Sequence, residues 1–308
     1  MAYPIDKKLV VGIASSALFD LTESDNVFKS MGEEAYRQFQ EDNIDKVLEK
    51  GVAFPFIRRL LGLNDAFPER QPIEVVLLSK NSPETGLRVF HSIQHYNLNI
   101  TRAAFFNGKS PFEYIEAFNA SLFLSASHED VLQAIHVGFP AGQVLDTIIE
   151  DNSIDSELRL AFDFDGVIID DEAEEIYEET KDLNKFHENE TSKILKPHNP
   201  GPLSDLFQKI SFFQKLERKK RKEDKNYVPL LKVSIVTARN APSHERMINT
   251  LKDWEINVDN AFFLGGIDKG RILKVLRPHM FFDDQKTHLN QIDNIPMVHI
   301  PFGVANKV

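Results

Sequence analysis

The chain has no cysteine among its 308 residues. Disulfide bonds, a thiolate nucleophile and a cysteine-based zinc site are therefore excluded. The histidines do not replace them, because His244, His279, His288 and His299 lack the spacing of zinc ligands. We interpret these histidines as structural or surface residues.

The chain also lacks a long hydrophobic run and an excess of positive charge. The apolar stretch within MAYPIDKKLVVGIASSALFD, at the start of the sequence, is too short to span a membrane and does not have the layout of a signal peptide. The formal net charge of −11 argues against long-range attraction to nucleic acid or anionic lipid. We expect a cytoplasmic protein that binds neither nucleic acid nor membranes. The sequence does not indicate an oligomeric state.

Two widely separated apolar segments end in carboxylates. The first, LRLAFDFDGVIID, contains Asp163 and Asp165, and the second, MFFDDQ, contains Asp283 and Asp284. Carboxylates at strand ends make an oxygen-rich pocket for a hard cation and a phosphate. Taken alone, the DFDG sequence is equally typical of a plain Asp-Gly turn. The segments between these two favour the functional interpretation.

Those intervening segments contribute groups suited to phosphate. KVSIVTARN ends a strand at Thr237, whose hydroxyl can donate to a phosphate oxygen, and GGIDKG places Lys269 just before the helical stretch RILKVL. Lys269 can balance the negative charge of Asp163 and of a phosphoryl group. Arg239 either holds the phosphate bidentately or forms a structural ion pair, and we slightly favour the ion pair. The order of all four segments predicts an aspartate-based phosphoryl-transfer site.

Hydrolysis of a phosphate ester needs a nucleophile, a proton for the leaving oxygen and charge neutralisation. We assign Asp163 as the nucleophile that forms an aspartyl-phosphate. Asp165, two residues further on, is the acid toward the leaving alkoxide and then the base toward water. Asp283 and Asp284 repel each other unless a cation lies between them and Asp163. Mg²⁺ fits best, with Asp163, Asp165, Asp283 and Asp284 as the expected ligands; helix capping is the alternative role for Asp284.

The sequence predicts an α/β fold that contains the same unit twice. Residues 75–126 align without a gap with residues 233–284, and apolar positions agree nearly throughout. Alternating strands and helices favour mainly parallel sheets. The competing explanation is that any two strand–helix units share this periodicity, and the gap-free register makes duplication the better one.

The two copies differ at the positions that carry the chemistry. Small or neutral residues stand in the first copy at the positions of Thr237, Lys269, Asp283, Asp284, Asp163 and Asp165, namely Ser79, Pro111, Ser125, Ala126, Ser15 and Ala17. We therefore expect residues 1–150 to be a degenerate α/β half without catalytic carboxylates. Residues 151–308 are the expected catalytic half, interrupted at about 171–231 by a helical insertion.

The order of these segments resembles that in the haloacid dehalogenase-like (HAD) phosphohydrolases. Their amino-acid sequences resemble those of the cytosolic 5′-nucleotidases of type I. The similarity spans most of the chain and rests on these motifs: SSALFD, AFPF, HYNL, FDFDGVIIDDEAE, VTARNAPSHERMINTL, DNAFFLGGIDKG and FFDDQKTH. The sequence departs from the family pattern around the second aspartate, where Phe164 and Gly166 stand, without loss of a reactive group.

The resemblance implies Mg²⁺-dependent hydrolysis of nucleoside 5′-monophosphates to nucleoside and phosphate. It implies HAD-like Rossmannoid parallel sheets, with residues 171–231 as the helical cap. It also implies that Asp163 is the nucleophile, Asp165 the acid and base, Thr237 and Lys269 the phosphate ligands, and Asp283 the metal ligand.

Two other functions stay open on the sequence. One is a phosphatase or phosphotransferase that acts on another small phosphate ester at the same site. The other is a nucleotide-binding regulatory protein with little turnover, which the degenerate first half would suit.

Overall fold

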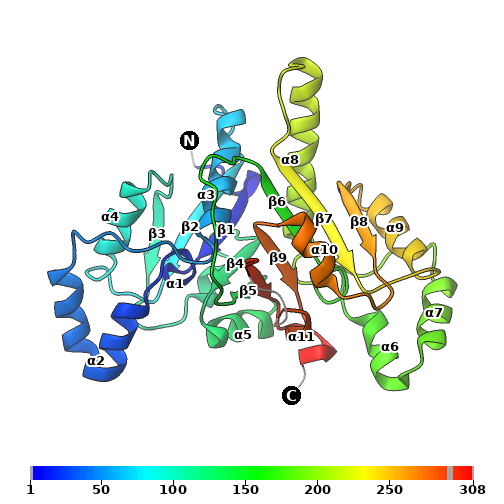
Figure 1. Cartoon of the computed structure of the whole chain (residues 1–308), viewed down its shortest axis with the longest axis horizontal. Helices are drawn as coiled ribbons and strands as arrows, with labels where there is room; N and C mark the ends of the chain where they lie inside the picture. Colours follow the sequence, from blue (N-terminus) through cyan, green and yellow to red (C-terminus); the bar gives the residue numbers. More distant parts are fainter. Residues whose placement is uncertain (1–2, 290–293, 307–308) are drawn as a thin grey trace. The chain divides into compact units, whose positions relative to one another are not determined.

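The computed structural model describes residues 3–289 and 294–306, and the chain divides into two compact units, Met1–Phe139 and Pro140–Val308 (Figure 1). Both units are built of strands and helices in alternation, which confirms the predicted α/β class. Among the described residues, no helix combines the length and the apolar character required to cross a bilayer.

The first unit is a four-stranded parallel sheet in the order β3-β2-β1-β4. Its strands are β1 (Leu9–Ile13), β2 (Ile73–Ser79), β3 (Arg102–Phe105) and β4 (Leu122–Ser125). Its helices are α1 (Ser15–Leu18), α2 (Thr22–Asp42), α3 (Phe54–Gly62), α4 (Leu87–His95) and α5 (His128–His136), with 3₁₀ turns η1 (Ile5–Lys7), η2 (Leu63–Ala66) and η3 (Phe112–Tyr114). Strands β1, β2 and β4 are buried along their whole length, so they form the core of this unit.

The second unit has its strands in the order β5-β10-β9-β6-β7-β8, all parallel except the antiparallel pair β5 and β10. Its strands are β5 (Ala141–Val144), β6 (Leu158–Phe162), β7 (Leu231–Thr237), β8 (Asn260–Phe263), β9 (Met280–Asp283) and β10 (Met297–His299). Its helices are α6 (Glu172–Thr180), α7 (Leu183–Ser192), α8 (Ser204–Glu223), α9 (His244–Asp253), α10 (Lys269–Leu276) and α11 (Lys286–Leu289), with the 3₁₀ turn η4 (Val304–Asn306). Strand β5 lies before the predicted boundary at residue 150 but pairs with β10.

The stretch predicted as one helical insertion contains helices that pack in different ways. Helix α8 buries Leu206, Phe207 and Ile210, and the ring of Phe207 lies 5.1 Å from that of Phe162 in β6. Neighbouring parallel strands such as β6 and β7 need a crossover connection, and α8 is the helix of that crossover. Helices α6 and α7 instead lie side by side near the carboxyl ends of β6 and β7 (Figure 1).

Four strands follow one another in the same spatial order in both units, β3-β2-β1-β4 in the first and β8-β7-β6-β9 in the second. Strands β2, β3 and β4 begin and end at positions that the sequence alignment matches to those of β7, β8 and β9. A close backbone approach recurs as well: a Cβ on Gly51 would lie 2.8 Å from the Phe19 nitrogen, and one on Gly201 would lie 2.2 Å from the Ile169 oxygen. Glycine is therefore required at both positions, since any side chain would collide with backbone atoms.

The structure corrects the sequence comparison at the end of the first strand of each unit. The Asp163 N–H donates to the Phe282 carbonyl at 2.8 Å, and the Ala14 N–H donates to the Leu124 carbonyl at 2.8 Å. The counterpart of Asp163 is therefore Ala14, and the expected match with Ser15 was wrong by one residue. The two segments differ in spacing at this turn, which the alignment of residues 75–126 could not reveal.

Candidate functional site

The side chains of Asp163, Lys269 and Asp283 meet at the carboxyl ends of two neighbouring strands. Asp163 directly follows β6 and Asp283 ends β9, and these strands pair with Phe162 opposite Phe282. Lys269 begins α10, and its Nζ lies 2.6 Å from Asp163 Oδ2 and 2.7 Å from Asp283 Oδ2. The three residues are 4%, 3% and 0% exposed. Parallel strands thus bring together residues that the sequence keeps far apart.

The charges of this trio shift the pKa values of its members. Burial on its own would raise the pKa of Asp283, but Lys269 and His288 outweigh it, and the pKa lies below the ordinary value. Burial raises the pKa of Asp163 to about 6, because Lys269 only partly offsets the loss of water and the nearby charges of Asp283 and Asp165. Burial would lower the pKa of Lys269, yet the two carboxylates raise it. Lys269 is therefore a cation whose charge both carboxylates share.

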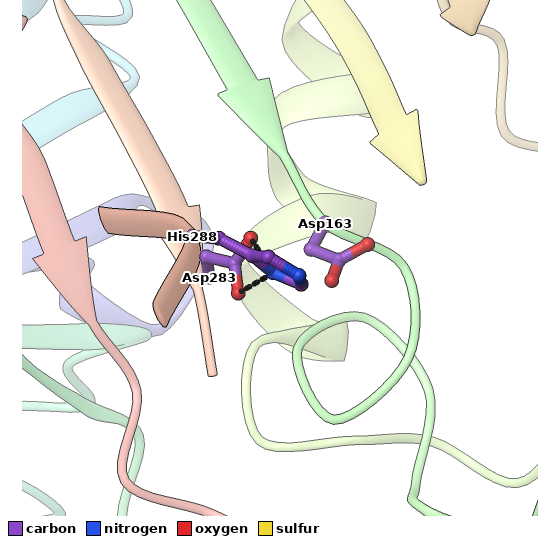
Figure 2. Close-up of side chains that lie close together, drawn as sticks. All are labelled: Asp163, Asp283 and His288. Carbon is purple, nitrogen blue, oxygen red and sulfur yellow. Dashed lines mark hydrogen bonds and ion pairs between the residues drawn. The ribbon is translucent and has the colours of Figure 1, made fainter. Parts of the chain in front are cut away.

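His288 belongs to this site, although the sequence analysis treated it as structural or on the surface. Its Nδ1 lies 3.2 Å from each carboxylate oxygen of Asp283, and Figure 2 marks these two contacts with dashed lines. Among the described residues, His288, Asp163 and Asp283 could hold a metal ion, because one ligand atom of each lies within 4.8 Å of the other two. The only available signal was its position in the first turn after the Asp283-Asp284 pair, because zinc spacing does not apply to an oxygen-based site.

The carboxylate of Asp284 is buried beside this trio and is not hydrogen-bonded within the described part of the chain. Asp284 is 1% exposed, and within the described residues neither of its carboxylate oxygens finds a donor. Burial raises its pKa well above the ordinary value, and the charges of Asp163, Asp283 and Glu174 raise it further. The helix-capping alternative for Asp284 therefore finds no support, since a cap accepts a hydrogen bond from the helix backbone.

The turn after Asp163 closes onto Asp284. Gly166 has φ +66°, and a Cβ there would lie 2.6 Å from Asp284 Oδ2. Only glycine adopts this backbone conformation without strain and leaves room for the carboxylate. Unpaired, buried carboxylate oxygens are costly unless a cation is bound. The donor set at this point, all oxygen with one nearby imidazole, fits a hard divalent cation.

Glu174 is a further carboxylate that the sequence analysis missed. Its Oε1 accepts from the Gln285 side-chain amide at 2.6 Å, while its Oε2 is buried and, within the described residues, unpartnered. Burial raises the pKa of Glu174 to about 8, and the charges of Asp165 and Asp163 contribute to the increase. Several acidic residues crowd the EAEEIYEET segment, so no periodicity could have singled out this one.

Asp165 and Arg239 form a bidentate ion pair. Arg239 Nε donates to Asp165 Oδ2 at 2.8 Å, and Nη2 donates to Oδ1 at 2.6 Å. The structure thus shows the ion pair that we favoured for Arg239, with the proposed acid as its partner. The same guanidinium donates through Nη1 to Glu190 of α7. Asp165 is therefore turned toward Arg239, whereas Asp163 is turned toward Lys269.

Glu190 anchors α7 to the rest of the unit. It accepts from Arg246 Nη1 of α9 at 2.7 Å, and its Oε2 lies 3.0 Å from His198 Nε2. Burial on its own would raise the pKa of Glu190, but the hydrogen bond with His198 and the charge of Arg239 outweigh it and lower the pKa to about 2. Thr237, the last residue of β7, is buried nearby and accepts the Arg239 N–H through Oγ1 at 3.2 Å. The predicted phosphate-binding residues Thr237 and Arg239 thus lie together, and Arg239 contacts the proposed acid, Asp165.

Comparisons with known proteins agree with this geometry. The family model described as 5′-nucleotidase matches residues 1–307. Human cytosolic 5′-nucleotidase 1B (Homo sapiens) is 32% identical over 287 residues, which covers 91% of this chain and 46% of the relative. The chain therefore spans about half the length of the curated relative that it matches. No solved structure matches the chain. On the full-length family match and this identity, the chain belongs to the 5′-nucleotidase family, as its motifs led us to expect.

Proposed function

We propose that this chain hydrolyses nucleoside 5′-monophosphates to nucleoside and phosphate through an aspartyl-phosphate on Asp163, with a divalent cation bound. The observation that supports it most directly is the Lys269 ammonium between Asp163 and Asp283, at 2.6 and 2.7 Å. Such a cation keeps a buried carboxylate ionised as a nucleophile and faces the charge of the incoming phosphoryl group.

The reaction proceeds in two displacements at phosphorus. An Asp163 oxygen forms a bond to phosphorus while the bond to the nucleoside 5′ oxygen breaks, and that oxygen takes a proton from Asp165. Water then attacks the aspartyl-phosphate and gives its proton back to Asp165, and the bond between phosphorus and Asp163 breaks. The Thr237 hydroxyl and the Lys269 ammonium hold the phosphoryl oxygens.

Asp165 has to leave Arg239 before it can act as an acid. Both of its carboxylate oxygens accept hydrogen bonds from the guanidinium, so neither is free to face the leaving oxygen. Arg239 also contacts Glu190, so the guanidinium keeps a carboxylate partner when Asp165 turns away. We infer that the ion pair in this structure is the resting arrangement of the acid.

We further propose that the cation is Mg²⁺ and that Asp163 and Asp284 are its side-chain ligands. When bound, Mg²⁺ supplies positive charge to the phosphoryl group and orients it for attack. The Asp283 carboxylate is already committed to Lys269, His288 and the Gln285 N–H, whereas the Asp284 carboxylate has no hydrogen-bond partner among the described residues. Asp283 then fixes Lys269 in place.

The HAD-like fold, its duplication and its cap are part of this proposal. One hydrogen bond of the second unit has a counterpart in the first. Arg246 donates to the Glu190 carboxylate at 2.7 Å, and Arg88 donates to the neutral Gln40 side chain at 3.3 Å. Each of these arginines also donates through Nε to a backbone carbonyl, of Lys196 and Lys46 respectively. These parallels support duplication, with α6 and α7 as the cap. The name of the human relative supports a cytosolic location.

A panel of phosphate esters tests the proposed activity. We expect the purified chain with Mg²⁺ to release phosphate from nucleoside 5′-monophosphates with a higher kcat/KM than from sugar phosphates. EDTA and Asp163→Asn should abolish the release, and the exposed Asp253→Asn should leave it unchanged.

Each other outcome of this panel favours a different function. Preference for a sugar phosphate, or transfer of phosphate to an added alcohol, would favour the phosphatase or phosphotransferase alternative. Nucleotide binding without release that depends on Asp163 would favour the regulatory protein.

A further inference from the structure

Glu174 is a half-buried acidic residue, with Oε2 buried, that the two displacement steps do not use. It lies in the first turn of α6, and electrostatic repulsion links it to Asp163, Asp165 and Asp284. Its Oε1 is held by Gln285, whose own N–H donates to Asp283 Oδ1 at 2.8 Å. Glu174 is thus connected to the strand end that carries both Asp283 and Asp284.

A purely structural role does not account for this placement. Structural carboxylates near α6 are paired with cations: Glu190 contacts Arg239 and Arg246, and Glu172 contacts Lys193 and Arg246. The positive end of a helix dipole favours a carboxylate in the first turn. It does not require that a carboxylate oxygen be buried near three other carboxylates. Oε2 of Glu174 has no partner among the described residues, and both oxygens of the fully buried Asp284 have none either.

The first unit supports a role tied to the site. Helix α2 begins at Thr22 and α6 at Glu172, so the third residue of α6, Glu174, corresponds to Ser24 of α2. Ser24 donates to the Leu21 carbonyl at 2.9 Å, a local helix contact. The first unit thus has no carboxylate at the position of Glu174, just as it has none at the positions of Asp163, Asp283 and Asp284.

We propose that Glu174 contributes a ligand oxygen to the divalent cation, on the side of Asp284, and so ties α6 to the metal site. This inference rests on the proposed function, because it assumes the same cation. A cation there would satisfy the free oxygens of Glu174 and Asp284 together. It would also hold α6, which comes from the segment between β6 and α8, against the ends of β6 and β9. Cation binding is then coupled to the position of the proposed cap.

The test is cation affinity without nucleotide, measured by calorimetry with Mg²⁺ and by the EPR signal of free Mn²⁺. We expect Glu174→Gln to raise Kd by about tenfold or more, the size of effect seen when support of a metal site is removed. Glu179→Gln removes the same charge from an exposed position of the same helix and should change Kd by less than about twofold. Asp284→Asn serves as the positive control for lost binding.

Two further readouts separate this role from a folding defect. Without cation, Glu174→Gln should melt at the same or a higher temperature than the wild type, because it removes a carboxylate from a mutually repelling group. Hydrogen exchange at α6 should slow when Mg²⁺ is added to the wild type, and this slowing should be lost in Glu174→Gln.

The possible failures are distinguishable. A Kd for Glu174→Gln within about twofold of the wild type, with Asp284→Asn defective, would overturn the role of Glu174 and leave the proposed function standing. A wild-type chain that binds neither Mg²⁺ nor Mn²⁺ and releases no phosphate would overturn both.

Discussion

A single ammonium group, Nζ of Lys269, offsets the charges of two buried carboxylates, Asp163 and Asp283. We predict that Lys269→Met lowers the free energy of unfolding by about 3–5 kcal/mol, because two buried carboxylates are left without a cation. It should also lower kcat by about 10²-fold or more, since charge stabilisation at phosphorus is lost. Chemical unfolding and phosphate release measure the two effects.

The control for this prediction is Lys274→Met, an exposed position of the same helix, which should change neither quantity. Added Mg²⁺ should raise the melting temperature of Lys269→Met more than that of the wild type, because the cation replaces part of the missing charge. A kcat for Lys269→Met close to that of the wild type would contradict the assigned role.

At the scale of residues, the sequence predicted the groups that end strands and Lys269 at the start of α10, and it missed two groups that lie within helices. Asp163 and Asp283 follow apolar runs, so their convergence follows from parallel pairing. Glu174 and His288 reach the site from α6 and α11, and their contacts depend on how these helices pack. The role of Arg239 was open for the same reason, because the sequence allowed either a phosphate contact or an ion pair. The structure shows the ion pair with Asp165, and the same guanidinium contacts Glu190 of α7.

At the scale of elements, α7 is held by the buried Glu190 between Arg239 and Arg246. We predict that Glu190→Gln lowers the free energy of unfolding near neutral pH by about 3–5 kcal/mol, because two guanidinium groups lose a carboxylate. The pKa of Glu190 is about 2 in the folded chain and near 4.5 otherwise, so its stabilising contribution is present above pH 4.5 and is lost as the pH falls toward 2. The stability gap between wild type and variant should therefore narrow by about 2 kcal/mol between about pH 6 and pH 3.

Urea unfolding at both pH values measures that gap, and a gap that stays constant would contradict the assigned charge state of Glu190. The first unit has the neutral residues Gln40 and Asn81 at the positions of Glu190 and Arg239, and the control variant copies this pair. The double variant Glu190→Gln, Arg239→Asn should cost less than the sum of the two single changes, since the residues are in contact.

The elements themselves were largely predictable, and their roles were less so. Apolar runs bounded by polar turns located β2, β3 and β4 and their counterparts β7, β8 and β9, and this pattern holds for the largely buried β2, β4, β7 and β9 as well as for the more exposed β3 and β8. The pattern could not separate α8 from α6 and α7. All are rich in charged residues, and only the packing of Phe207 on Phe162 shows that α8 covers the sheet.

At the scale of the whole molecule, the chain contains two similar units, and the proposed chemistry resides in one. The first unit has Ala14, Ser125 and Ala126 where the second has Asp163, Asp283 and Asp284. We predict one high-affinity Mg²⁺ per chain by calorimetry, lost in Asp284→Asn and retained in Ser125→Ala. Two equivalent sites, or a Ser125→Ala variant without binding, would contradict the assignment.

The central claim is that Asp163 becomes phosphorylated during turnover. The most direct measurement is a rapid acid quench with a nucleoside 5′-monophosphate that carries ³²P, followed by mapping of the labelled peptide. The account predicts an acid-stable, base-labile label on the peptide that contains Asp163, with no label in Asp163→Asn. A label on another residue, or phosphate release by Asp163→Asn at the wild-type rate, would contradict it.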